Sequence, residues 1–507
     1  MRSSALRRTY AQATRGEDVT DIKNSLAQSV SADCVTVDPD VLASYSSDLS
    51  FVRPMMPKAV VKPKSSADVK ASVDWARETD TPLVPVSSGG PRLHGDTVPS
   101  VPDAVIVDLS GMDRILSVNR QHRMVVVEPG VTYGKLQSEL AKKGMTLATS
   151  LAPRATKSVL ASTLEVEPRL NSIHQWNYMD PLRCMEVVWG DGNLMFTGEA
   201  GGAPRDLKTQ WDSEKWQVSG TGPMMLDFYR LLTSAQGTMG IVTWASLKCE
   251  LLPQIHKMFF ASADHLTDLI DFVYRVIHFR FSDELFILNR VQLANLMGES
   301  TEEIDSLRRD LPAWTVLIGI AGRELLPEER VRAHETSIRD IAQEHGQTLV
   351  SSLPGVRAED ALEKAINPSG EKYWKQTYKG AFDEIFFSTT LDKTPGFIEA
   401  MYAKAVEVGY PVGDIGVYIQ PQNMGTSYHL EFSLPYAPDN AAEKDLASKL
   451  FHSASEMLAA MGAYYSRPYG IWSRLQLNKD AQSYQTLTKL RGIFDPQGIM
   501  NPGKLAI

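Results

Sequence analysis

Residues 84–99, which read VPVSSGGPRLHGDTVP, combine a short apolar run with a Ser-Ser-Gly-Gly turn and a histidine. Glycine lets backbone N–H groups converge on an anion without side-chain clashes, and serine hydroxyls add further donors. Phosphate is therefore the first ligand that this stretch suggests, and an ordinary glycine-rich turn is the alternative. A second stretch, SAQGTMGIV at residues 234–242, is by itself typical of a tight turn between a helix and a strand.

The elements around the first stretch predict how it is positioned. Residues 59–63 indicate a strand, residues 65–80 a serine-capped amphipathic helix, and residues 82–87 a second strand that leads into the glycines. Phosphate-binding loops occur at this point of a β-α-β unit. Further elements are expected as strands at 103–110 and 123–130, a helix at 132–144 and a strand-turn-strand at 185–198.

Beyond Leu251 the pattern changes. Long amphipathic stretches alternate with β-rich pieces such as residues 313–322 and 426–436, which suits an antiparallel sheet with helices on one face. A long helix is expected to end at Gly462 and to be followed by an aromatic turn, and a last helix leads to a Pro-Gly-containing end. No internal repeat is found.

Composition restricts the classes of function. A chain of 507 residues is too long for one core, so we expect two or three domains. The net charge of −9 argues against nucleic acid or an anionic membrane as the main partner. No apolar run approaches the roughly 18 residues that span a bilayer. Three scattered cysteines indicate a reducing, cytoplasmic location without a disulfide framework or an iron–sulfur cluster.

The first residues carry four arginines and no acid before Glu17, which suits either a solvated helix or a targeting segment. The sequence has no G-x-G-x-x-G, Walker A, G-x-S-x-G or zinc-spaced His and Cys pairs, so common nucleotide, hydrolase and zinc functions lack support. Four separated segments nevertheless resemble one family, in the right order. They are residues 85–99, 125–136, 232–253 and 494–505.

Together these segments resemble the FAD-linked oxidases of the vanillyl-alcohol oxidase and p-cresol methylhydroxylase superfamily, which also holds the glycolate-oxidase and D-lactate-dehydrogenase type enzymes. The resemblance implies an α+β fold with a two-part FAD-binding domain at 1–250, completed by 478–507. It also implies a substrate-binding cap domain at 251–477, with an antiparallel sheet and flanking helices. The cofactor-binding residues that it implies are Val86, Ser87, Ser88, Gly89, Gly90, His94, Gly95, Pro153, Gly237, Gly240, Ile241 and Lys504.

Two branches of the family differ in their chemistry. The hydroxy-acid branch carries a metal-binding H-x-G-D-G-N-x-H stretch, but this chain has Gln420 and Gln422 there and only His429, so we expect no metal site. The phenol-oxidising branch places an acid beside the flavin. By position that acid is Glu165, a candidate acid/base group, with Glu167 as the neighbour that could face the pocket instead.

The aromatic turn at 462–472 resembles the family's phenolate-binding turn. Arg467 is the candidate anion holder, together with nearby tyrosines, since a phenol is easier to oxidise at its para-benzylic carbon when its oxygen is an anion. Aromatic packing at a domain seam is the alternative. The tyrosines considered are Tyr464, Tyr465 and Tyr469.

Some relatives attach FAD covalently. By resemblance, the attachment position corresponds to His429 in this chain, with Tyr428 as the second candidate. Pro91 follows the two glycines directly, which makes His94 a poor attachment point. A satisfied core histidine is the alternative for His429. Three further residues are candidates to line the pocket: Arg169, His174 and Tyr178.

The resemblance therefore implies an FAD-dependent oxidase or dehydrogenase that takes hydride from an oxygenated or benzylic carbon, most simply of a para-substituted phenol. A 2-hydroxy-acid dehydrogenase in which Arg467 binds a carboxylate is one alternative, and an FAD-binding structural or electron-passing subunit is another. The electron acceptor would be oxygen or a separate carrier, and we expect a homo-oligomer.

Overall fold

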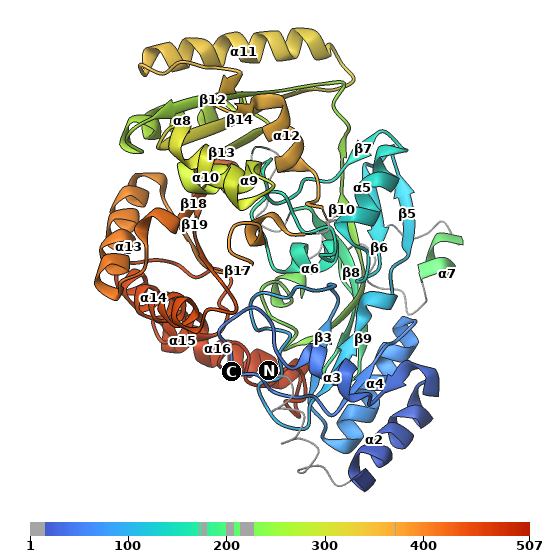
Figure 1. The fold of residues 1–507 in the computed structure, drawn as a ribbon. Coiled ribbons are helices and arrows are strands. Elements are labelled where there is room, and N and C mark those ends of the chain that lie inside the picture. Colours follow the sequence, from blue (N-terminus) through green and yellow to red (C-terminus); the bar gives the residue numbers. More distant parts are fainter. Residues whose placement is uncertain (1–15, 172, 174–179, 199–206, 213–227, 371) are drawn as a thin grey trace.

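Residues 16–171, 173, 180–198, 207–212, 228–370 and 372–507 are described in the computed structural model of the protein. The blue and cyan elements of Figure 1 form one half of the molecule, and the yellow and orange elements form the other. The red C-terminal helix α16 returns to the first half (Figure 1). The described residues contain no helix that is long and apolar enough to cross a membrane.

The first sheet has a parallel core, as the β-α-β pattern predicts. Strand β4 pairs in parallel with β2 and with β3, and α4 connects these two outer partners. Ser65 caps α4, because its hydroxyl accepts a hydrogen bond from the amide of Asp68 at 3.2 Å. The strand order is β1 (Val35–Thr36), β2 (Ala59–Val61), β4 (Val105–Asp108), β3 (Leu83–Val86).

The second sheet is antiparallel and packs beside the first (Figure 1). Its central strand β10 begins at Gly240, directly after the second glycine-containing stretch. The strand order is β5 (Ile115–Asn119), β6 (Met124–Val127), β10 (Gly240–Lys248), β8 (Leu182–Trp189), β9 (Leu194–Phe196). Strands β7 (Met145–Thr146) and β11 (Glu250–Leu251), the latter directly after β10, form a separate two-stranded sheet.

The third sheet belongs to the second half and is antiparallel throughout. The strand order is β12 (Ile255–Ala263), β14 (Trp314–Gly322), β13 (Glu284–Asn289), β18 (Gly416–Gln422), β19 (Ser427–Tyr436), β17 (Ala381–Thr389). A small hairpin of β15 (Ser352–Leu353) and β16 (Val356–Arg357) accompanies it.

Helices cover both faces of the third sheet, so the expectation of helices on one face is wrong. Along β12, Phe259 and Ala261 pack with α8 and α11, whereas Met258 and Phe260 pack with α9, α10 and α12. Successive strand residues point to opposite faces, and here both sets are apolar. Neither face of this strand is therefore marked as the solvated side by polar residues.

The helices of the first half are α2 (Gly16–Ser29), α3 (Pro39–Tyr45), α4 (Ser66–Thr79), α5 (Tyr133–Ala141), α6 (Val159–Leu164) and α7 (Leu207–Asp212). The helices of the second half are α8 (Thr267–Phe279), α9 (Arg290–Met297), α10 (Thr301–Asp310), α11 (Pro327–Glu344), α12 (Ala358–Ile366), α13 (Thr394–Val408) and α14 (Ala441–Ala460). The last two helices are α15 (Ile471–Leu477) and α16 (Ala481–Phe494).

The C-terminal tail returns to the edge of the parallel sheet. The amide of Leu83 donates to the carbonyl of Ile499, and the amide of Asn501 donates to the carbonyl of Leu83, both at 2.8 Å. The ammonium of Lys504 donates to the carbonyls of Gly95 and Val98, both at 2.7 Å. The tail therefore supports the strand and the loop that the sequence places at the cofactor. The domain limits given above stay a proposal.

Candidate functional site

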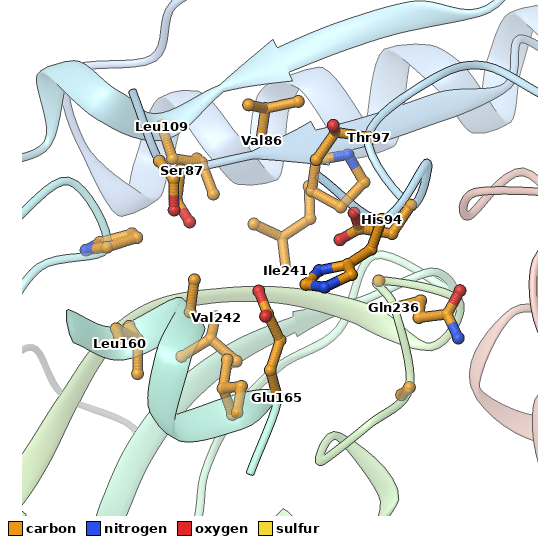
Figure 2. Close-up of a pocket in the computed structure, with 18 of the residues that line it drawn as sticks. Val86, Ser87, His94, Thr97, Leu109, Leu160, Glu165, Gln236, Ile241 and Val242 are labelled. Carbon is orange, nitrogen blue, oxygen red and sulfur yellow. The ribbon is translucent and has the colours of Figure 1, made fainter. Parts of the chain in front are cut away.

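A cavity with about 1040 Å³ of empty space lies between the first two sheets and is open to solvent. Its walls come from β3 and the loop after it, from α6, and from the turn before β10 together with the start of that strand. Figure 2 shows Leu160 and Val242 on one wall, Val86 and Leu109 on the other, and Glu165 and His94 projecting between them. Its size suits a large organic ligand.

The predicted cofactor residues divide into two groups. Those that line this cavity are Val86, Ser87, Ser88, His94, Gly237, Gly240 and Ile241. Gly89, Gly90, Gly95 and Lys504 are not among its lining residues, and Pro153 lines a second cavity described below. The serines of the loop therefore face the cavity, while the glycines form the turn behind them.

The Ser-Ser-Gly-Gly loop is bound to residues 154–158. The amide of Gly89 donates to the carbonyl of Thr156 at 3.1 Å, and the hydroxyl of Ser88 accepts from the amide of Ser158 at 3.1 Å. The guanidinium of Arg154 donates to the carbonyl of Pro91. The Gly89 amide is thus already used inside the protein. A phosphate at this loop would have to rely on Ser87 and on neighbouring amides.

The two glycines of the second stretch are required by the packing of the protein itself. Gly237 has a φ of +71°, and a Cβ there would lie 2.4 Å from Cγ of Pro85. A Cβ on Gly240 would lie 2.6 Å from the carbonyl oxygen of Val188. Both glycines line the cavity, and their lack of a side chain lets the turn approach β3 and β8.

The residues present fit a flavin nucleotide. The apolar walls suit a flat ring system, and Ser87 and Ser88 bring polar groups to the same cavity. Thr97 also lines it, and its hydroxyl is buried without a hydrogen-bond partner among the residues that the structure describes. A bound ligand would supply that missing partner.

Glu165 lines the cavity, as predicted for the candidate acid/base group, but it is held in an ion pair. Both of its carboxylate oxygens accept from the ammonium of Lys157, at 2.6 and 2.8 Å. Lys157 is buried, and although burial lowers the pKa of its ammonium, Glu165 and Glu167 outweigh burial and raise it. Lys157 therefore carries a fixed positive charge, a role that no motif in the sequence indicates.

Glu167 faces a second cavity, of about 580 Å³. Its carboxylate accepts from the hydroxyl of Ser162 at 2.5 Å and lies 3.5 Å from the ammonium of Lys157. Burial by itself raises the pKa of Glu167, but the charge of Lys157 and the Ser162 hydroxyl outweigh burial and hold this pKa below its usual range. Glu167 is therefore a carboxylate at neutral pH.

The second cavity is strongly polar and adjoins the first. Leu93, His94, Arg154 and Lys157 line both cavities. Its other charged or phenolic residues are Glu167, Tyr373, Lys375, Glu384, Tyr418, Glu431 and Arg467. None of these except Arg467 and Glu167 was singled out in the sequence.

The cap side of this cavity is one face of the third sheet. On β17 and β19, Phe386 pairs with Glu431 and Ser388 pairs with His429, so Glu384, two residues before Phe386, shares their face. Lys375 joins the two acids, since its ammonium donates to Glu384 and, at 2.5 Å, to Glu431. Charged residues inside otherwise apolar strands were the signal that could have revealed this group.

Arg467 lines the second cavity and is only 5% exposed. Its guanidinium lies over the ring of Phe386, 3.8 Å from the ring centroid. Among the residues that the structure describes, the side chain of Arg467 forms no ion pair and no hydrogen bond, whereas Lys157 and Lys375 are each held by two carboxylates. The structure thus leaves a buried cation available in this cavity.

Tyr464 does not join Arg467. It is 55% exposed, and its backbone bridges to Ser388 at the edge of the sheet. Tyr465 is buried and donates to the carbonyl of Ser455, while Tyr469 lines the first cavity. The tyrosine of this turn that reaches a cavity is therefore Tyr469.

His429 lies in the cap sheet, buried, with its Nε2 3.3 Å from Oε2 of Glu431. Burial lowers its pKa more strongly than Glu431 raises it. His429 is not among the residues that line the first cavity. Covalent attachment through it stays a prediction.

The Gln420 amide is used inside the protein, since it donates to the carbonyls of Leu285 and Pro421. Among the described residues no group of three or more His, Cys, Asp or Glu is placed to hold a metal ion. Arg169 is buried against Tyr133 and Thr163, and lines neither cavity. His174 and Tyr178 lie outside the described residues.

Comparisons with known proteins agree with an FAD-binding fold. The family described as FAD binding domain matches residues 57–198, and the family described as FAD linked oxidases, C-terminal domain, matches residues 292–505. D-2-hydroxyglutarate dehydrogenase of Stutzerimonas stutzeri (strain A1501) is 24% identical over 93% of this chain and 96% of its own. The flavoprotein subunit of 4-cresol dehydrogenase (hydroxylating) from Pseudomonas putida is 23% identical over 94% and 93%.

Among solved structures, p-cresol methylhydroxylase with substrate bound superposes on this chain with a TM-score of 0.80, at 18% identity and 98% coverage of both chains. The two family matches identify the chain as an FAD-dependent oxidoreductase. The two family models together match most of the chain, which therefore belongs to the FAD-linked oxidases, and FAD is its cofactor.

Proposed function

We propose that this FAD-dependent enzyme oxidises a para-substituted phenol, taking hydride from the benzylic carbon of the para substituent. The observation that carries the proposal is Arg467, a buried guanidinium without an ion pair among the described residues that faces a polar cavity. A guanidinium in such a place stabilises an oxygen anion strongly, because little water screens the interaction.

Charge at the phenol oxygen is what this chemistry requires. Loss of hydride from the benzylic carbon of a phenolate gives a neutral quinone methide, whereas the same loss from a neutral phenol gives a cation. Arg467 would hold the oxygen as an anion, and the ring of Phe386, which supports the guanidinium, fixes its orientation. FAD, when bound, supplies the hydride acceptor. The acceptor that reoxidises it would be oxygen or a separate carrier.

A 2-hydroxy acid is the second candidate substrate, since the same guanidinium can bind a carboxylate through two parallel hydrogen bonds. The relative named for D-2-hydroxyglutarate favours this alternative. The lack of a described metal-binding group at Gln420 and His429 favours the phenol.

Anaerobic titration of the purified, flavin-loaded protein tests the proposal. We expect bleaching of the flavin absorbance by 4-alkylphenols and not by D-2-hydroxyglutarate, D-lactate or glycolate. Arg467→Met should slow reduction about a hundredfold, in line with the loss of one strong transition-state contact. Arg474→Met, on the exposed side of α15, is the control and should leave the rate unchanged. Bleaching by a hydroxy acid alone would overturn the phenol assignment.

A further inference from the structure

A chain of ionisable side chains runs from the cap sheet to the loop beside the flavin cavity. Nε2 of His429 lies 3.3 Å from Glu431, whose other oxygen accepts from the ammonium of Lys375 at 2.5 Å. Lys375 also donates to Glu384, and Oε2 of Glu384 lies 3.8 Å from Nε2 of His94. His94 is the end of this chain that lines both cavities.

His94 is held in place but its ring nitrogen is not satisfied. The imidazole stacks on Tyr469, with centroids 4.6 Å apart, and meets the ring of Phe386 edge-on at 5.5 Å. Its Nε2 is buried without a hydrogen-bond partner among the described residues. A buried ring nitrogen requires a partner, and Glu384 is the carboxylate next to it.

Glu384 and Lys375 are fixed charges. Burial raises the pKa of Glu384, but the Lys375 ammonium and His94 outweigh it and lower this pKa to about 2. Burial lowers the pKa of Lys375, but Glu384 and Glu431 outweigh it and hold this pKa well above its usual value. A permanent carboxylate therefore faces His94, which is how a base histidine is oriented and its charged form stabilised in hydrolase triads.

The groups that share a cavity wall with His94 or contact it come from several elements. They are Arg92 and Asp96 in its own loop, Arg53 after α3, Arg154 and Lys157 before α6, Glu165 and Glu167 after it, Tyr373 and Lys375 before β17, Asp383 and Glu384 on β17, Tyr418 on β18, Glu431 on β19, His452 on α14, and the turn residues Arg467 and Tyr469. Of the acids, Glu165 is neutralised by Lys157 through both oxygens. Both oxygens of Glu165 are thus already engaged inside the protein.

We propose that His94 is the acid/base group of this enzyme and takes the proton of the substrate hydroxyl, while Glu384 positions the imidazole. This inference rests on the proposed function. In the step, the O–H bond of the phenol breaks and an N–H bond forms on the imidazole, with no change of oxidation state. The negative charge stays on the phenol oxygen beside Arg467, and the positive charge on His94 faces Glu384. Arg467 and His94 line the same cavity, as this step requires.

The first test measures ionisation of a bound phenol and needs no turnover. The flavin-loaded protein is titrated with 4-nitrophenol, whose neutral and anionic forms absorb differently. Wild-type protein should bind the anion at pH values where the free ligand is still neutral. His94→Gln should bind the anion only at a higher pH than wild type, because the proton acceptor is lost while Arg467 still favours the anion. His122→Gln, an exposed histidine in the β5–β6 turn, is the matched control and should behave as wild type.

The second test uses reduction of the flavin by a 4-alkylphenol. His94→Gln should slow reduction about a hundredfold, a usual contribution of a general base, and added imidazole should restore part of the rate. Glu384→Gln should shift the acidic limb of the pH–rate profile to lower pH, because the protonated imidazole loses its neighbouring carboxylate. A merely structural role of Glu384 would lower the rate without moving that limb.

If His94→Gln ionises 4-nitrophenol and reduces its flavin as wild type does, the proposal is overturned. If the losses expected for His94→Gln occur only in Glu165→Gln, the acid/base role belongs to Glu165. If no phenol reduces the flavin but a 2-hydroxy acid does, the phenol assignment fails separately. The role of His94 is then tested by the rate at which that 2-hydroxy acid reduces the flavin of His94→Gln, since the hydroxyl proton still needs an acceptor. An unchanged rate there overturns the role of His94 as well.

Discussion

The imidazole of His94 stacks on the ring of Tyr469, with 4.6 Å between centroids and 11° between planes. His94 belongs to the loop after β3, and Tyr469 belongs to the turn before α15, so the pair joins the two halves of the molecule beside the flavin cavity. Tyr469 also lines a third, mostly apolar cavity of about 670 Å³, together with Leu93 and His94. The stacked pair is a shared wall of these cavities.

Tyr469→Ala should therefore weaken both the fold and the site. Removal of a buried aromatic side chain costs about 3 to 5 kcal/mol, so urea denaturation should show a large loss of stability. Tyr469→Phe keeps the stacking, and among the described residues the Tyr469 hydroxyl makes no hydrogen bond, so this variant should stay within about 0.5 kcal/mol of wild type. A loss in Tyr469→Phe as large as in Tyr469→Ala would contradict a packing role.

The fold was predictable from the sequence where the pattern is local. The β-α-β unit follows from its strand periodicity and its serine cap, and the structure has it as expected. The covering of both faces of the third sheet was not predictable in the same way. Phe259 and Phe260 point to opposite faces and are both buried, so alternation gives no sign of an outer face.

The residue types of the site could be predicted from the sequence, but the contacts between these residues could not. The motif placed Glu165 at the cavity, but Lys157, which neutralises it, lies in an ordinary stretch without a motif. Tyr464 and Tyr469 are the same residue type in one turn, yet only the backbone geometry decides that Tyr464 is exposed. Pairing between Lys375 and Glu431 joins residues far apart in the chain, which no local pattern reports.

The buried ion pair of Lys157 should matter far more than an exposed one. Lys157→Met leaves the buried carboxylates of Glu165 and Glu167 without their cation and should cost about 3 to 5 kcal/mol in unfolding free energy. Lys135→Met, which removes an exposed pair with Asp113, should cost about 1 kcal/mol or less. Adding Glu165→Gln to Lys157→Met should recover part of the loss. Equal effects of the two lysine variants would show that Lys157 is not a structural charge.

Acid should destabilise the protein through Glu384. Its pKa is lowered to about 2 in the folded state, against about 4.3 for an unfolded glutamate, so the unfolded chain binds more protons between these values. This contribution to stability is complete above about pH 4.3 and is lost as the pH falls towards 2, to a total of about 3 kcal/mol. Unfolding free energies of wild type and Glu384→Gln, measured across this range, should show a flatter pH dependence in the variant. Parallel curves would contradict the ion pair with Lys375.

Gly90→Ala and Gly237→Ala test whether each glycine is required by the fold or by cofactor binding. Gly237→Ala forces a side chain to within 2.4 Å of Pro85 at a positive φ, so it should unfold at markedly lower urea. A Cβ on Gly90 meets no atom within 4 Å, so Gly90→Ala should fold as stably as wild type. Because Gly90 is not among the residues that line the flavin cavity, this variant should also keep the affinity of the protein for FAD. Equilibrium dialysis of flavin measures that affinity, and a clearly weaker value would show that the backbone at Gly90 approaches the FAD pyrophosphate.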